Sequence, residues 1–144
     1  EYMWALQKRV IACAEGAAKA TGCTLGVNEY DNAYEPLKRN NALLDAWRGN
    51  MKRVGAPESP EVKDRLGSSD VGNVSQVVPA IQPLVKIAPD GTPIHSRDFE
   101  AAAVSPLARE GLLKAAKTMA MTTLDLLATP ALLAQARREF GETR

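Results

Sequence analysis

The spacing of the apolar residues changes once within the first thirty positions, and that change restricts the folds open to the chain. Over residues 3–20 apolar side chains recur every three or four positions, which predicts an amphipathic helix. Gly22 suits the end of that helix. Over residues 23–30 apolar positions alternate with small or polar ones, which predicts a half-buried strand. A helix and one strand cannot cover both faces of that strand, so the segment needs partner strands.

A second helix is expected to begin near Asn40 or Asn41, either of which can cap it, and to end at Gly55. The predicted buried face of this helix consists of Leu44, Trp47, Met51 and Val54.

Two further helices are predicted towards the C-terminus. Ser105 and Thr129 each place a hydroxyl at a capping position, and a proline follows each of them at the first helical position. The apolar residues expected to be buried in these helices are Leu112, Leu113, Ala116, Met119, Ala120, Leu124, Leu127, Leu132, Leu133, Ala136 and Phe140.

Between the helices, two short apolar runs are typical of strands. Residues 74–81 form the first run, which Pro79 shortens or bends. Residues 84–88 form the second, before a Pro-Asp-Gly turn. Together with the strand predicted at 23–30, these runs predict an α/β fold, or α+β if the chain is taken as a fragment.

Composition and charge exclude several classes of partner. The 18 basic and 17 acidic residues leave a formal charge of +1, so no nucleic-acid partner is expected. No apolar run reaches about 18 residues, and no membrane-spanning helix is predicted. The two cysteines, Cys13 and Cys23, do not make a disulfide framework, and two small buried thiols in a reduced, cytoplasmic protein are expected.

Two segments could carry chemistry. The single histidine, His95, lies just beyond the Pro-Asp-Gly turn and can be a metal ligand, a general base or a polar surface residue. Residues 67–73 are mostly small, which permits tight turns and close approach of the backbone to a ligand. Asp70 and Asn73 add polar groups there. An ordinary turn between two elements is the alternative for this segment.

Taken together, these segments resemble one family. From Gly67 the chain reads Gly-Ser-Ser-Asp-Val-Gly-Asn-Val-Ser, then Val-Val-Pro, and a His-Ser pair follows about twenty residues later. This order resembles the aminoacylase/carboxypeptidase family of metallopeptidases, in the branch of p-aminobenzoyl-glutamate hydrolase-like and β-alanyl-dipeptidase-like amidohydrolases. Residues 112–140 are similar to that branch's final helices, and residues 15–18 and 34–37 to its lid helix and return connector. The resemblance covers nearly the whole chain.

The resemblance implies a catalytic α/β domain with an inserted lid that often mediates homodimer formation. Residues 1–35 would be the second half of the lid or dimerisation domain, and residues 36–144 the C-terminal part of the catalytic domain. Two divalent metals, usually zinc and sometimes manganese or cobalt, would activate a water that attacks an amide carbonyl of an N-acyl amino acid or dipeptide.

For individual residues, the resemblance implies that His95 ligates one metal and that Asp70, Gly72 and Asn73 border the substrate. Arg97 could meet a substrate carboxylate, although a solvated arginine is the simpler interpretation.

The family's other ligands and its catalytic glutamates cannot be placed in this sequence, so no catalytic residue is assigned. A zinc site needs three or four protein ligands, and one histidine supplies one. A missing N-terminal half of the enzyme is therefore an expected partner, and the resemblance implies a small amide substrate and a second copy of the protein as further partners. The alternative is a non-catalytic assembly module.

With one imidazole and no assigned catalytic carboxylate, the isolated 144-residue chain should not hydrolyse amides. Steady-state assays with N-acyl amino acids and dipeptides in the presence of zinc, manganese or cobalt would check this. Metal-dependent turnover by the pure chain would contradict it.

Overall fold

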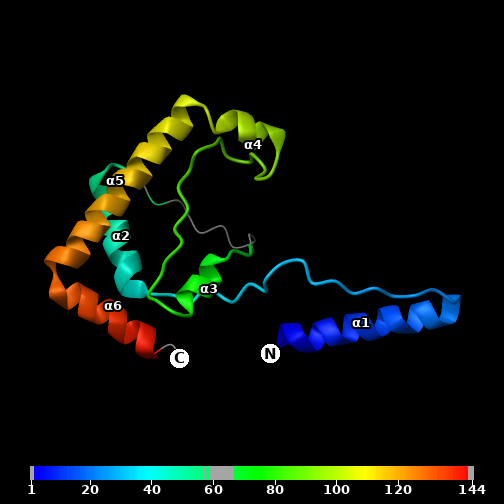
Figure 1. The fold of residues 1–144 in the computed structure, drawn as a ribbon. Helices are drawn as coiled ribbons and strands as arrows, with labels where there is room; N and C mark the ends of the chain where they lie inside the picture. Colours follow the sequence, from blue (N-terminus) through cyan, green and yellow to red (C-terminus); the bar gives the residue numbers. More distant parts are fainter. Residues whose placement is uncertain (1, 57, 59–66, 143–144) are drawn as a thin grey trace. The chain divides into compact units, whose positions relative to one another are not determined.

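A computed structural model describes residues 2–56, 58 and 67–142. The chain divides into two compact units, Glu1–Ala33 and Tyr34–Arg144 (Figure 1). The roles of lid and catalytic domain that the sequence suggested for its two parts stay predictions.

Unit 1 contains one helix, α1 (Tyr2–Thr21), and an extended tail. Gly22 follows the helix with a φ of 71°, and the backbone N–H of Cys23 donates to the carbonyl of Ala18 at 3.0 Å. A left-handed glycine with such a hydrogen bond satisfies an otherwise free carbonyl at a helix end. The predicted helix and its end are thus confirmed, although no residue of α1 is buried.

The predicted α/β class is wrong for the part of the chain that the structure describes, where all regular elements are helices. Residues 23–30 are extended without pairing, and residues 84–88 likewise form no strand. The start of the run predicted at 74–81 belongs instead to α3 (Val71–Ser75) and the turn after it. An apolar run becomes a strand only when a neighbour accepts and donates its backbone hydrogen bonds, and no described segment does so here.

The body of unit 2 consists of α2 (Asn41–Arg53), α5 (Pro106–Ala128) and α6 (Pro130–Glu142), which pack against one another (Figure 1). Their beginnings follow the predicted signals. The side chain of Asn40 accepts from Leu43 N at the start of α2, and Ser105 accepts from Ala108 N at the start of α5. Thr129 separates α5 from α6, and Pro130 begins α6.

The contact between α2 and α5 is polar at its centre. Asn50 is 2% exposed and donates to Thr122 Oγ1 at 3.1 Å and to Asp125 Oδ2 at 2.7 Å. The side-chain oxygen of Asn50, Oδ1, accepts from Arg53 Nη1 at 3.0 Å. Because a buried amide without partners is costly, this complete set of bonds fixes how α2 sits on α5.

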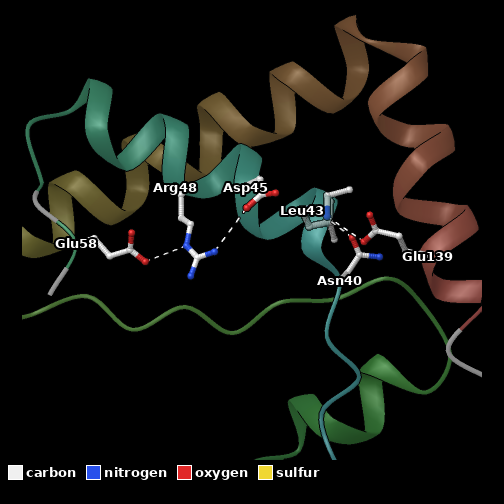
Figure 2. Close-up of polar contacts among 7 residues, drawn as sticks. Asn40, Leu43, Asp45, Arg48, Glu58 and Glu139 are labelled. Carbon is white, nitrogen blue, oxygen red and sulfur yellow. Dashed lines mark hydrogen bonds and ion pairs between the residues drawn. The ribbon is translucent and has the colours of Figure 1, made fainter. Parts of the chain in front are cut away.

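A second polar contact joins the N-terminus of α2 to α6. Asn40, which is 2% exposed, donates from Nδ2 to the carbonyl of Ala136 at 2.8 Å. Glu139 reaches from α6 towards Asn40 and Leu43 at the start of α2 (Figure 2). Its Oε2 accepts from Ala42 N at 3.0 Å. A carboxylate at a helix N-terminus satisfies free N–H groups and interacts favourably with the helix dipole.

The apolar face predicted for α5 is wrong. Leu112, Leu124 and Leu127 are 66%, 63% and 76% exposed, and the other large residues expected there also face solvent. The buried residues of α5 are Ala108, Gly111, Thr118 and Thr122. These small side chains allow close approach, since a Cβ at Gly111 would lie 2.5 Å from the carbonyl oxygen of Lys86.

The apolar predictions hold better for α2 and in part for α6. In α2, Trp47 is 8% exposed and Leu44, Met51 and Val54 are partly buried. In α6, Ala136 is fully buried while Leu133 is exposed.

Two small helices complete unit 2. The first is α3, and the second is α4 (Arg97–Ala102), which follows the Pro-Asp-Gly turn. Among the described helices, none combines the length and apolar character needed to cross a membrane.

The carboxylate of Glu139 should make stability depend on pH. The backbone N–H of Ala42, which donates to it, lowers the pKa of Glu139 below its ordinary value of 4.5. Since the folded pKa is lowered, the stabilisation is present above pH 4.5 and is lost as the pH falls through the folded pKa. Glu139→Gln keeps an acceptor but does not titrate, so its urea-unfolding midpoint should fall less between about pH 6 and about pH 3 than that of the wild type.

Glu110→Gln provides a matched control. The pKa of Glu110 is also lowered, but by a hydrogen bond and ion pair to Lys114 on an exposed helix face. Its effect on the midpoint should disappear in about 1 M salt, whereas the effect at Glu139 should persist. Identical behaviour of the two variants in high salt would contradict the assigned hydrogen bonds.

Candidate functional site

The small-residue segment 67–73 ends in the first turn of α3. Asp70 occupies the N-cap position, yet its side chain makes no capping hydrogen bond and is exposed. The hydroxyl of Ser69 lies 3.4 Å from Asp70 Oδ1 and accepts from Val71 N at 3.1 Å. The carboxylate of Asp70 is thus held near Ser69 but is open to solvent.

Gly72 is buried where the backbone of residues 35–36 passes over α3. A Cβ at this position would lie 1.8 Å from the carbonyl oxygen of Glu35, far inside van der Waals contact. The glycine is required by this close approach and not by its φ, because α3 is helical here. The adjacent Asn73 accepts on Oδ1 from Glu35 N at 3.0 Å.

Ser75 and Gln76, two and three positions after Asn73, make the same kind of contact, and neither of them was assigned a role from the sequence. Ser75 is fully buried, accepts from Lys38 N at 2.9 Å and donates to the carbonyl of Gly72. Gln76 donates from Nε2 to the carbonyl of Pro36 at 2.7 Å. No local pattern could have revealed these bonds, because their partners lie 37 and 40 positions away.

His95 lies in the turn before α4. Its φ of 59° is the only positive φ of a non-glycine residue in the described part of the chain. Histidine is among the residue types that tolerate this conformation better than most. The neighbouring Ser96 fixes the turn, since its hydroxyl donates to the carbonyl of Pro93 at 2.6 Å and accepts from Phe99 N at 3.2 Å.

The imidazole of His95 is exposed and makes no hydrogen bond to any described residue, so both ring nitrogens are available. A neutral imidazole in this state fits one position of a zinc coordination sphere. Within residues 2–56, 58 and 67–142, no three His, Cys, Asp or Glu side chains lie close enough together to hold a metal. This part of the chain therefore holds no complete metal site by itself.

None of the predicted site residues lines the hollow described among the helices of unit 2. A hollow of about 510 Å³ lies between α2, α5 and α6, and none of His95, Asp70, Gly72 and Asn73 lines it. The two cysteines, predicted to be buried, are both exposed free thiols. Arg97 is exposed at the first position of α4.

Comparison with known proteins relates almost the whole chain to one group of enzymes. It is 38% identical over 138 residues, or 94% of its length, to the Xaa-Arg dipeptidase of mouse (Mus musculus). It is 34% identical over 138 residues to the human (Homo sapiens) Xaa-Arg dipeptidase, again over 94% of its length. It is 38% identical over 131 residues, or 87% of its length, to one subunit of the p-aminobenzoyl-glutamate hydrolase of Escherichia coli (strain K12).

This chain is a homologue of aminoacylase/carboxypeptidase-like amidohydrolases. The resemblance inferred from residues 67–75, the Val-Val-Pro run, the His-Ser pair and the helical segments is therefore confirmed. The chain spans about a third of the length of these relatives, namely 32%, 31% and 27%. No family model matches it.

Gly72→Ala should test whether the connector lies on α3 as described. The added Cβ would collide with the carbonyl oxygen of Glu35, so the unfolding free energy should fall by about 1–3 kcal/mol or more. Gly49→Ala is the matched control, because Gly49 is inside α2 with nothing within 4 Å of its Cβ position. That variant should gain about 0.5–1 kcal/mol from helix propensity in the same urea titration. Equal stability of the two variants would contradict the described contact.

Proposed function

We propose that this chain forms the C-terminal part of a metal-dependent amidohydrolase that cleaves an amide bond of a dipeptide or N-acyl amino acid. The observation that carries the proposal is the homology, over 94% of the chain, to two proteins named as dipeptidases. The hydrolase name of the bacterial relative supports the same reaction class.

In this proposal His95 ligates a divalent metal, with zinc as the first candidate and manganese or cobalt as alternatives. Three features support the role, namely an exposed ring, two ring nitrogens free of described hydrogen bonds, and a turn fixed by Ser96. A bound divalent metal would lower the pKa of a coordinated water to about 7, so that hydroxide forms at neutral pH. The remaining ligands and the catalytic base would come from residues outside this chain.

Residues 67–73 border the substrate in this proposal, and the three predicted residues have different roles. Asp70 offers an open carboxylate, while Gly72 and Asn73 hold the backbone beside it in place. A carboxylate attracts a cationic substrate group and repels an anionic one. Dipeptides ending in arginine are therefore the first substrates to test, and p-aminobenzoyl-glutamate is the comparison, in line with the names of the relatives.

Assembly is a second function, favoured by the surface of unit 1. Apolar side chains of α1 are exposed, including Tyr2 at 77% and Val10 at 60%. Apolar side chains that face solvent can bind another protein surface, so we propose a homodimer and an N-terminal partner region for the whole protein. The whole protein would be cytoplasmic.

His95→Asn in the full-length protein is the decisive variant. Asparagine tolerates the left-handed backbone at this position but lacks the imidazole, so the fold should survive while the metal site is damaged. We expect kcat/KM for an Xaa-Arg dipeptide to fall on the order of a hundred-fold or more, with less zinc per protein by elemental analysis. The unfolding midpoint of the metal-free protein should stay near that of the wild type.

His95→Gly is the control for the backbone, since it removes the ring and any left-handed strain together. It should match His95→Asn in metal content and activity. Wild-type activity and zinc content in both variants would refute the ligand role. Absence of amide hydrolysis by the metal-loaded wild type, on both substrate classes, would refute the hydrolase.

A further inference from the structure

We propose that Asn73, Ser75 and Gln76 are positioning residues for the substrate loop, the name used here for residues 67–73. They tie the loop to the connector, defined here as residues 34–38, so that the connector sets where Asp70 lies. The consequence for substrate binding rests on the proposed function of residues 67–73. The tie itself does not, and it can be measured without any activity.

Four of the described contacts join α3 and its C-cap residue Gln76 to the connector, and they use residues 72–76. Glu35 N, Pro36 O and Lys38 N are hydrogen-bonded by the side chains of Asn73, Gln76 and Ser75, at 3.0, 2.7 and 2.9 Å respectively. The fourth contact is the close passage of the Glu35 backbone over Gly72. A shift of α3 along or away from the connector would break several of these contacts at once.

The helix α3 cannot hold its own position. It has five residues, and its N-cap residue Asp70 makes no side-chain capping bond. Helices this short are unstable in water without tertiary contacts. Apart from the bonds to the connector, one side-chain hydrogen bond is described between the loop and another segment, from Gln82 Nε2 to Ser69 Oγ at 3.0 Å. The connector therefore supplies most of the described polar contacts that place α3.

The connector, in turn, is anchored at its C-terminal end. The ammonium group of Lys38 lies 5.6 Å from the centre of the Phe140 ring on α6. Two positions later, Asn40 is hydrogen-bonded to the carbonyl of Ala136 on the same helix. These contacts link the position of Asp70 to the α2–α5–α6 bundle through the connector. No described hydrogen bond joins Asp70 to that bundle directly.

At its other end, the connector begins directly after unit 1, which ends at Ala33. A displacement of Tyr34 and Glu35 would be transmitted to α3 through Asn73 and Gln76, and so to Asp70. By linkage, a substrate that holds Asp70 in place must also hold the connector in place. The inference is thus that substrate binding at the loop and the conformation of the connector are energetically coupled.

Gln76→Glu in the full-length protein removes the donor to Pro36 while keeping the size of the side chain. Hydrogen exchange followed by mass spectrometry should show faster exchange in the peptides that cover residues 34–38 and 67–73. KM for an Xaa-Arg dipeptide should rise about five- to ten-fold, the range for one lost hydrogen bond, with kcat within about two-fold of the wild type. A purely structural role would lower the unfolding midpoint without this split between KM and kcat.

Two substitutions at Asn73 separate loss of the hydrogen-bond acceptor from the effect of changing the residue. Asn73→Asp keeps the acceptor for Glu35 N and should preserve wild-type exchange of the connector, whereas Asn73→Ala should behave like Gln76→Glu. Gln7→Glu, the same chemical change within α1, should leave both readouts unchanged.

Unchanged exchange of residues 34–38 and 67–73 in Gln76→Glu would overturn the proposal, and so would faster exchange with an unchanged KM. If the wild type hydrolyses none of the substrates, the proposed function fails instead. Exchange in residues 67–73 then still decides whether the connector positions the loop.

Discussion

The hydrogen bonds at the two ends of α2 are the interactions on which unit 2 depends. Asn40 binds the backbone of α6 at one end, and Asn50 binds Thr122 and Asp125 of α5 at the other. The apolar core among the described residues is small, with four alanines and Trp47 buried. Because burying alanine contributes little free energy, directional polar bonds, and not apolar volume, determine how the three helices fit together.

Residues 67–76 follow the same physical rule on a smaller scale. Gly72 and Ser75 are buried against the connector, and the side chain of Asn73 is engaged there as well. Two of the three residues predicted to border the substrate therefore already contact the protein's own chain. Asp70, whose carboxylate is exposed, is left as the side chain best able to meet a ligand.

Helix ends, which depend on residues close together in the sequence, could be predicted. Contacts between segments far apart in the sequence could not. Asn40, Ser105 and Gly22 mark helix ends where local chemistry requires them, and all three predictions are confirmed. The strands at 23–30 and 84–88 were wrong because pairing depends on a neighbour that periodicity does not reveal. The apolar face of α5 was wrong for a related reason, since its threonines and small residues, not its leucines, meet the rest of unit 2.

The candidate site shows the same limit. The small-residue segment 67–73 and His95 stand out in the sequence because their residue types are locally unusual. The hydrogen bonds of Ser75 and Gln76 could not be predicted in this way, because they span 37 and 40 positions. Hydrogen bonds within the chain nevertheless fix both segments of the candidate site. Residues 67–73 are bonded to the connector, and Ser96 fixes the turn that contains His95. Groups positioned in this way before a ligand arrives lose less entropy when it binds. Pre-organisation of this kind suits a histidine that ligates a metal and a loop that borders a substrate, even when each depends on separate local contacts.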